Sequence, residues 1–425
     1  MDAMMSVPNQ RIRVAVFVGT RQEAVKMAPV VRALRRRPRV FEVKVIATAK
    51  DRQLFDQVID KFALTVDIDL DVVRDNQSLP SLWASALERI DRVLDEEFPD
   101  LVLVQGDTMT AFAASFAAFL HHIPVGHIEA GLRSGDLQNP FPEEANRRLT
   151  SIVSDIHFAP TSLARYNLIR EGISYNRIAV TGSPVVDALQ RLTAQANDFA
   201  SLPPDMPQTS HRIVLVASLR RESWGEDIEN SCTALWDLVQ RFPDIAVVYP
   251  LHPSAFVRKM VLRQLSGHAR IHLIEPMDYL AFLRLLQAAH LVLTDSSSVQ
   301  EEAPCFGKPV LVLRRTTERP EAAFAGLAKI IGTSPATIVE EAGRLLADEE
   351  AHAAMVSGPN PFGDGRAAER IVDAIERWKK NASPLLLPGA EYQPDSPFLL
   401  QQRNRQSVGE LTPAGRRGPT GAPPL

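Results

Sequence analysis

Cysteine and any excess of positive charge are scarce in this sequence, and long apolar runs are absent from it. Only two cysteines occur, Cys232 and Cys305, so neither a disulfide framework nor a cysteine-based metal cluster is predicted. Lys and Arg number 47 against 51 Asp and Glu, which leaves no basic field for nucleic acid or an anionic membrane. No run approaches the roughly 18 apolar residues of a membrane span, and the polar N-terminus lacks a signal peptide. We therefore expect a soluble, cytoplasmic protein that acts on a small molecule.

The alternation of short apolar runs with helix-compatible stretches indicates the fold class. The runs Ile12–Val18, Val43–Ala47 and Leu101–Val104 are each followed by a helical stretch, and a second cycle of the same kind opens at Arg212. Buried strands that alternate with helices are typical of a parallel sheet covered on both faces. Because 425 residues exceed one hydrophobic core, the sequence predicts an α/β protein of two doubly wound, Rossmann-like domains facing a central cleft.

The expected domain boundaries follow from composition. We place the first domain at residues 11–195 and the second at 205–365, joined by the proline-rich bridge Asp198–His211. The helical stretch 366–380 is expected to pack back on the first domain. Residues 382–425 are rich in proline and lack apolar periodicity, so we expect them to be disordered.

A polar turn in the second domain is a candidate anion site. Ser296, Ser297 and Ser298 follow the apolar run His290–Thr294 and precede the helix-compatible segment Gln300–Phe306. The first N–H groups of a helix lack internal partners and lie at the positive end of its dipole, which suits phosphate. Arg319 follows the next run, so the pair suggests a nucleotide-sugar site.

Basic residues follow the first strand of the chain. Gly19 ends that strand, and Arg21 and Lys26 lie at the start of the next helix, where they could contact a diphosphate. A solvated surface position or a structural ion pair is the alternative.

Acidic residues at three strand or helix ends of the first domain are the catalytic candidates. Each also has a structural alternative. Asp107 could cap the following helix, Glu129 could pair with Arg133, and Glu143 could be stabilised by the positive end of a helix dipole. Their convergence opposite a diphosphate site favours acid–base chemistry on a sugar, since proton removal and return at carbon need more than one such group.

Several segments taken together resemble the bacterial UDP-N-acetylglucosamine 2-epimerase family, whose fold is the two-domain glycosyltransferase-B type. The resemblance runs from Arg13 to about Arg377 and is carried by the segments Gly19–Ala24, Gln105–Thr108, Gly126–Arg133, Phe141–Glu144, Arg220–Ser223, Gln300–Pro304 and Thr316–Ala322. It implies elimination of UDP across C1–C2 to 2-acetamidoglucal and re-addition with inversion at C2, without a cofactor or metal. Asp107, Glu129 and Glu143 would be the catalytic acids.

The resemblance also implies binding residues and a homodimer. Phe282 and Met277 would lie near the uracil and Glu302 would hold the ribose. Gln53 and His252 would fit a second, activating nucleotide sugar. The remaining implied contacts to the UDP-sugar are Arg21, Lys26, Arg220, Ser296, Ser297, Ser298 and Arg319.

The chain departs from the family pattern at a few positions. Leu219 stands where the family has a histidine, Lys50 where it often has a glutamine, and Ser297 and Ser298 where it has glycines. A hydrolysing epimerase that releases N-acetylmannosamine and UDP, an altered-substrate relative and a non-catalytic sugar-nucleotide sensor are therefore alternatives to the epimerase.

Overall fold

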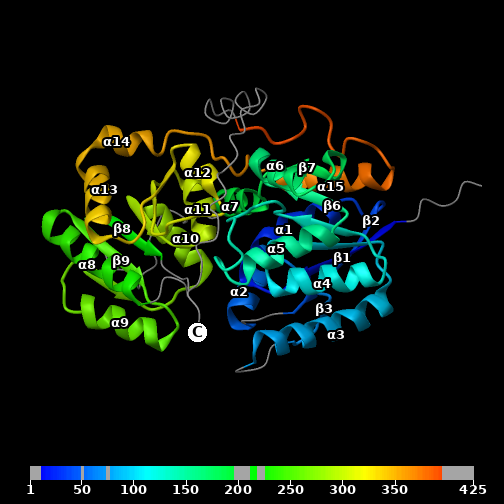
Figure 1. Cartoon of the computed structure of the whole chain (residues 1–425), viewed down its shortest axis with the longest axis horizontal. Coiled ribbons are helices and arrows are strands. Elements are labelled where there is room, and N and C mark those ends of the chain that lie inside the picture. The colour runs from blue at the N-terminus through cyan, green and yellow to red at the C-terminus, as the bar shows by residue number, and fades with distance from the viewer. Residues whose placement is uncertain (1–10, 49–51, 73–76, 196–210, 218–224, 395–425) are drawn as a thin grey trace, which may run out of the picture.

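The computed structural model of the chain consists of two lobes, each built around one parallel sheet (Figure 1). It describes residues 11–48, 52–72, 77–195, 211–217 and 225–394, and the statements below concern these residues. The bridge between the domains therefore lies largely outside the described residues, as does the chain beyond residue 394.

The first lobe holds a seven-stranded sheet of order β3-β2-β1-β4-β5-β6-β7. Its strands are β1 (Ile12–Val18), β2 (Phe41–Ala47), β3 (Ile68–Asp69), β4 (Leu101–Gln105), β5 (Val125–Ile128), β6 (Ile156–Ala159) and β7 (Ile178–Val180). Its helices are α1 (Arg21–Arg35), α2 (Arg52–Phe62), α3 (Leu79–Glu97), α4 (Met109–Leu120), α5 (Glu143–Val153), α6 (Ser162–Arg170) and α7 (Pro184–Gln195).

The second lobe holds a six-stranded sheet of order β10-β9-β8-β11-β12-β13. Its strands are β8 (Arg212–Ala217), β9 (Ile245–Pro250), β10 (Ile271–Ile274), β11 (Leu291–Thr294), β12 (Val310–Val312) and β13 (Ala328–Ile330). Its helices are α8 (Glu226–Arg241), α9 (Ala255–Leu265), α10 (Tyr279–Ala288), α11 (Ser297–Glu302), α12 (Pro320–Phe324), α13 (Pro335–Ala347) and α14 (Glu349–Ala354).

The predicted α/β class is confirmed, and both sheets are parallel throughout the described strands. Strand order reverses between β1 and β4 in the first sheet and between β8 and β11 in the second. Loops diverge on opposite sides of a sheet at such a point, so the carboxyl ends of these strands form a crevice suited to ligands. The predicted strand Ile12–Val18 has the expected bounds.

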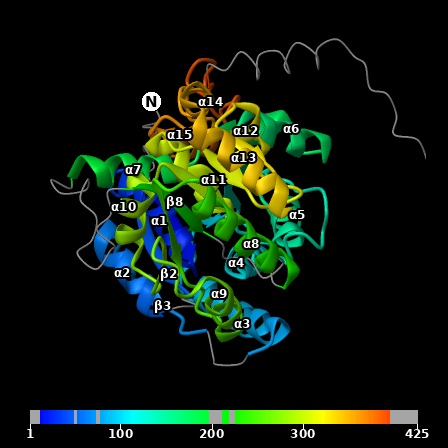
Figure 2. The same ribbon diagram turned by 90° about the vertical axis from the view of Figure 1, so that its left-hand side faces the viewer.

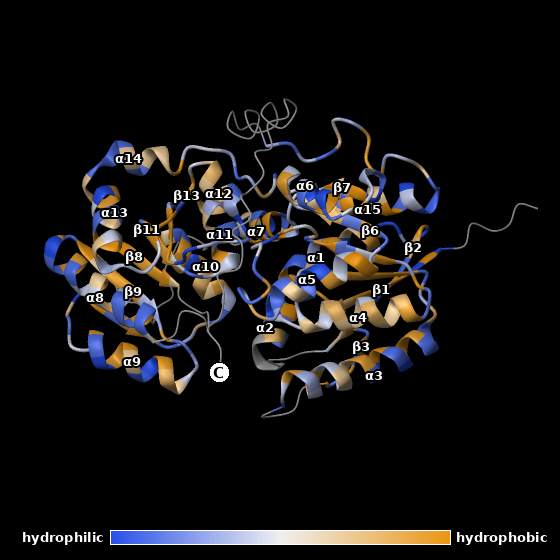
Figure 3. Ribbon diagram, in the orientation of Figure 1, coloured by the Kyte–Doolittle hydropathy of each residue, from blue (hydrophilic) through white to orange (hydrophobic). Residues whose placement is uncertain are grey.

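Apolar strands and amphipathic helices account for the layers. Strands β4 and β11 are buried at every residue, and in Figure 3 the hydrophobic colour concentrates in the sheets while hydrophilic faces of the helices point outward. Side-chain caps mark the starts of α1 and α4, because an oxygen there satisfies an otherwise unpaired N–H. Thr20 accepts from the N–H of Glu23 at 3.2 Å, and Thr108 from that of Ala111 at 3.0 Å.

The helix after the anion turn differs from the expectation of Gln300–Phe306. Helix α11 begins at Ser297 and ends at Glu302, and a 3-10 turn, Ala303–Phe306, follows it. Pro304 lies in that turn and lacks the N–H that an α-helix needs, which explains why α11 is short. Ser297 and Ser298 thus belong to the first turn of the helix.

The C-terminal part of the chain returns from the second lobe to the first (Figure 1). Helix α15 (Ala367–Lys379) packs against α1 and α7. The expectation of disorder from residue 382 onward is wrong for 382–394, because Leu385, Leu386 and Tyr392 are buried there and the N–H of Tyr392 donates to the carbonyl of Val180 at 2.9 Å. Apolar residues between the prolines provide this contact without periodicity.

Helices of both lobes lie on two opposite sides of the molecule. In both views α3 and α9 lie on one side, and α14 and α15 lie on the opposite side (Figure 2). Among the described helices, none combines the length and the apolar character that crossing a bilayer would require.

Candidate active site

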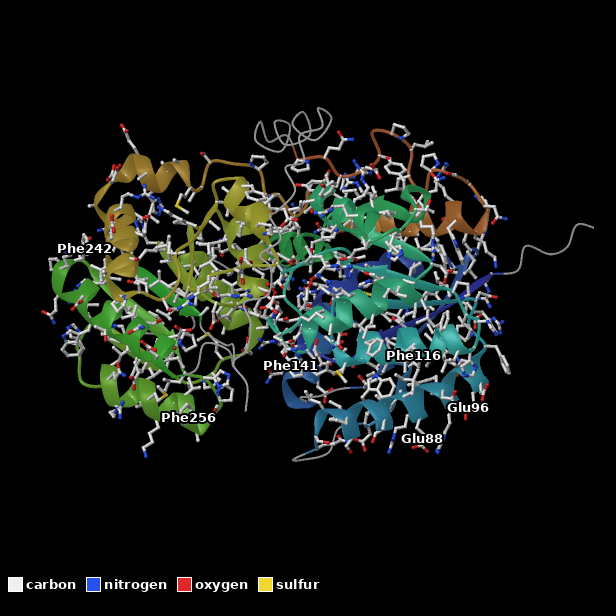
Figure 4. The ribbon with its side chains drawn as sticks, in the orientation of Figure 1. Glu88, Glu96, Phe116, Phe141, Phe242 and Phe256 are labelled. Carbon is white, nitrogen blue, oxygen red and sulfur yellow. The ribbon has the colours of Figure 1, made fainter. Side chains whose placement is uncertain are left out.

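A pocket of about 700 Å³ lies between the lobes at the carboxyl ends of β1, β4, β5 and β11. A smaller pocket of about 90 Å³ adjoins it and shares Gln22, Ser296 and Ser298 with it. Phe141 of the larger pocket lies where the first lobe faces the second (Figure 4). Together the pockets collect the described candidates for catalysis and substrate binding: Arg21, Lys26, Asp107, Glu129, Glu143, Met277, Phe282, Ser296, Ser297, Ser298, Glu302 and Arg319.

Glu129 is the most heavily paired of the three acids. It follows β5 with a φ of 66° and is 6% exposed. It forms ion pairs with Lys26 of its own lobe and, at 2.6 Å, with Arg319 of the other lobe, and it accepts a hydrogen bond from Gln105 at 2.6 Å. Burial raises the pKa of Glu129 although both cations oppose the rise.

The alternative that Glu129 pairs with Arg133 is wrong, because Arg133 pairs with Glu171 at 2.6 Å. Glu129 lines the larger pocket.

A second buried acid, Glu301, joins the same cluster from the other lobe. Its carboxylate pairs with Arg319, lies 3.2 Å from Lys26 and accepts a hydrogen bond from Ser183 at 2.9 Å. Burial disfavours its charge, but Arg319 and Lys26 outweigh burial and lower the pKa of Glu301. The cluster therefore links the two lobes through opposite charges that are shielded from water.

Asp107 lies in the loop after β4 and points toward α5. Its carboxylate pairs with Arg147, and its backbone carbonyl accepts from Asn146 at 2.9 Å. Burial alone would raise the pKa of Asp107, but the Arg147 guanidinium outweighs burial and lowers it. The alternative that Asp107 caps α4 is wrong, because Thr108 performs that role.

Glu143 is the first residue of α5 and lines the larger pocket. Its neighbour Glu144 does not line that pocket: it is fully buried and accepts hydrogen bonds from Arg147 at 2.8 Å and from the N–H of Ser134 at 3.0 Å. Of the two adjacent glutamates, Glu143 is thus the one presented to a ligand.

The serine turn and the smaller pocket lie side by side in the second lobe. Ser296 precedes the first turn of α11, and the hydroxyl of Ser297 donates to Glu318. In the smaller pocket, the hydroxyl of Tyr279 donates to Glu302 at 2.8 Å, and the guanidinium of Arg21 lies over the Tyr279 ring at 5.6 Å. Met277 and Phe282 complete its apolar wall.

Some residues of the site were not singled out in the sequence. Besides Glu301 and Arg147, Glu23 lines the larger pocket and accepts hydrogen bonds from the N–H of Gly19 at 2.9 Å and from Thr108 at 2.6 Å. Burial raises the pKa of Glu23 to about 7. An acid in the first turn of a helix was the available signal, but only packing distinguishes a buried acid from a solvated one.

Three sequence candidates remain: Arg220, Gln53 and His252. Arg220 lies outside the described residues, as do Leu219 and Lys50, and Gln53 belongs to α2 with its side chain outside the described part of the chain. His252 follows β9, and its Nδ1 accepts from the N–H of Ser254 at 2.9 Å. It lines neither pocket.

Known proteins resemble the chain over most of its length. The family model described as UDP-N-acetylglucosamine 2-epimerase matches residues 32–376. The "Probable UDP-N-acetylglucosamine 2-epimerase" of Ralstonia solanacearum is 47% identical over 373 residues, which cover 86% of this chain and 99% of that protein. The "UDP-N-acetylglucosamine 2-epimerase" of Escherichia coli K12 is 45% identical over 371 residues, with coverage of 86% and 98%.

Solved structures agree with these sequence matches. The "putative UDP-N-acetylglucosamine 2-epimerase from Listeria monocytogenes" has a TM-score of 0.82 at 42% identity and covers 88% of this chain and 98% of its own. The UDP-GlcNAc 2-epimerase from Neisseria meningitidis bound to UDP-GlcNAc has a TM-score of 0.82 at 42% identity, with coverage of 86% and 100%. The chain belongs to the UDP-N-acetylglucosamine 2-epimerase family.

Proposed function

We propose that the protein interconverts UDP-N-acetylglucosamine and UDP-N-acetylmannosamine by eliminating UDP and adding it back. The observation that carries the proposal is the larger pocket, where Asp107, Glu129 and Glu143 of one lobe meet Arg319 of the other. The carboxyl groups can carry out the proton transfers that this reaction needs. The cations of the adjacent diphosphate site can stabilise the leaving group.

The nucleotide is assigned to the smaller pocket and to the serine turn. Phe282 and Met277 offer an apolar surface to the uracil, and Glu302 a carboxylate to the ribose hydroxyls. The diphosphate would then lie against the start of α11 and the cations Lys26 and Arg319. This arrangement directs the sugar into the larger pocket, toward the three acids.

Elimination is led by cleavage of the C1–O bond. The hydrogen at C2 has no adjacent carbonyl to acidify it, so positive character at C1 must develop before a carboxylate removes that proton. The C1–O electron pair leaves with the β-phosphate, where cations stabilise it. Re-addition of UDP to 2-acetamidoglucal, with a proton delivered to the other face of C2, completes the epimerisation.

Diphosphate binding also changes the pairing of the acids. Lys26 and Arg319 are neutralised by Glu129 and Glu301, so an incoming diphosphate must compete with these carboxylates. When Arg319 turns to the diphosphate, Glu129 loses a counter-ion in a buried position. The loss favours its protonated form, which is the state required to return a proton to C2.

Incubation with UDP-N-acetylglucosamine in D2O tests the proposal. We expect deuterium at C2 and accumulation of the manno epimer, followed by NMR. Absence of both products would refute the proposal. Accumulation of free N-acetylmannosamine and UDP would identify the enzyme as hydrolysing, because water would then have intercepted the reaction.

A homodimer is part of the proposal. Exposed apolar side chains on α5 support it: Ile152 is 72% exposed and Leu149 is 43% exposed. Large apolar side chains close together on a surface are typical of an interface. Light scattering should give twice the 47.0 kDa of one chain, and a mass of one chain would contradict the dimer.

A further inference from the structure

Helix α5 carries Glu143, one of the three acids, and Arg147, which contacts another of them, Asp107. Glu143 at its start lines the larger pocket, and one turn later Arg147 lies with its guanidinium between Asp107 and Glu144. Arg147 is 3% exposed, and the neighbouring Asn146 donates to the backbone carbonyl of Asp107 at 2.9 Å. The helix thus fixes both the side chain and the backbone of Asp107 in relation to Glu143.

We propose that Arg147 is the positioning residue that holds Asp107 in the pocket as an ionised carboxylate. The proposal rests on the proposed function, since it concerns one of its three acids. Arg147 itself does not line the pocket, so it would act through Asp107 and not on the substrate.

The geometry explains why an arginine is needed. Its two terminal nitrogens point in different directions, one to Asp107 and the other to Glu144 at 2.8 Å. The planar fork of a guanidinium satisfies two acids at fixed angles, which the single ammonium of a lysine cannot do. Glu144 also accepts from the N–H of Ser134, so it anchors the guanidinium to the loop before α5.

The other charges around Asp107 cannot replace Arg147. From the second lobe, Arg319 favours the ionised form of Asp107 and Glu318 opposes it. His127 of β5 carries no charge at neutral pH, because burial lowers its pKa to about 4. Arg147 is therefore the main counter-charge that keeps Asp107 ionised.

The acids of the pocket then have different roles. An aspartate held ionised can accept a proton or stabilise positive character at C1, but it cannot donate a proton at neutral pH. Proton donation to C2 falls to Glu129 or Glu143. Burial raises the pKa of Glu129, which suits such a donor.

The experiment compares Arg147→Gln with Arg148→Gln in the full-length enzyme. Arg148 is a matched control, because it pairs with the same Glu144 at 3.1 Å but does not contact Asp107. For Arg147→Gln we expect kcat to fall about 10²-fold with little change in KM, the typical size of a lost acid–base contribution. Arg148→Gln should stay within about twofold of the wild type, because Glu144 keeps Arg147 and the N–H of Ser134 as partners.

The pH profile separates positioning from a structural role. With Arg147 removed, burial raises the pKa of Asp107, so the acid limb of kcat should move to higher pH by about one unit or more. Arg147→Lys keeps the charge and should leave that limb near its wild-type position. An acid limb that Arg147→Gln does not move, or moves no more than Arg148→Gln does, would overturn the inference.

A double-mutant cycle tests the contact independently of activity. The effects of Arg147→Gln and Asp107→Asn on the unfolding free energy should be non-additive if the two side chains act as a unit. Additive effects would overturn the inference even in an active enzyme. If the wild type exchanged no deuterium while the cycle showed coupling, the proposed function would fail and the Asp107–Arg147 contact would stand.

Discussion

Single residues in this site are defined by their partners more than by their type. Glu129 and Glu301 are both buried glutamates that share Lys26 and Arg319, yet their pKa values move in opposite directions. Both carboxylates pair with the two cations and accept a side-chain hydrogen bond, Glu301 from Ser183 and Glu129 from Gln105. Repulsion by Glu301 adds to burial in raising the pKa of Glu129. Two glutamates in one cluster thus differ because of the charges around each of them.

Replacing Glu129 by glutamine should separate catalysis from binding. An amide cannot transfer a proton, so we expect deuterium incorporation at C2 to fall by about 10²-fold or more. UDP affinity, measured by calorimetry, should not weaken, because the variant removes a carboxylate that competes with the diphosphate for Arg319. A catalytically silent sensor would instead bind UDP without any turnover in either protein.

At the scale of elements, neighbouring strands β5 and β6 carry a pair of buried histidines. His127 and His157 are register partners in the sheet, and both are fully buried. Burial lowers the pKa of His127 from 6.5 to about 4 and that of His157 well below 6.5. Below about pH 6.5 the unfolded chain therefore binds protons that the folded chain does not bind, and stability falls as pH falls.

The His157→Leu variant should reduce this loss of stability. Urea unfolding between pH 7 and pH 5 measures the slope of the unfolding free energy, and the variant should lose up to about 1.4 kcal/mol per pH unit of it. The exposed His122 serves as the control, and His122→Asn should leave the slope as in the wild type. An unchanged slope in His157→Leu would show that this histidine does not set the acid stability.

At the scale of the whole molecule, hydrogen bonds and ion pairs cross between the lobes. Glu321 of the second lobe accepts from Thr161 of the first at 2.6 Å, and Glu301 reaches Ser183 and Lys26. The C-terminal part of the chain also connects the lobes, because α15 and residues 382–394 follow the second lobe and pack on the first. Both features hold the two lobes together around the larger and the smaller pocket.

Truncation tests the contribution of the returning segment. A chain ending at residue 381 loses the buried Leu385, Leu386 and Tyr392, each of about 1.5–3 kcal/mol by apolar burial, and should unfold at a markedly lower temperature. A chain ending at residue 394 keeps every described contact and should match the full-length protein. Equal melting temperatures of the two truncated chains, measured by calorimetry, would contradict a stabilising role.

The sequence by itself determined the fold class, the strands with continuous apolar runs and the residues that gather at strand ends. Apolar runs alternating with helical stretches leave few other solutions, and parallel strands bring their carboxyl ends together. Thus the positions of Asp107, Glu129 and Arg319 along the chain were enough to predict that they share one site.

Only the tertiary structure decided which charges pair. The ion-pair partners of Glu129 are Lys26 and Arg319, the latter 190 positions away, and not Arg133. Glu301 and Arg147 became part of the site only through their buried ion pairs. The packing of residues 382–394 was likewise missed, because it depends on contacts with β7 and α15 and not on any local pattern. Side-chain pairing over such separations depends on how distant elements pack, which no local stretch of residues encodes.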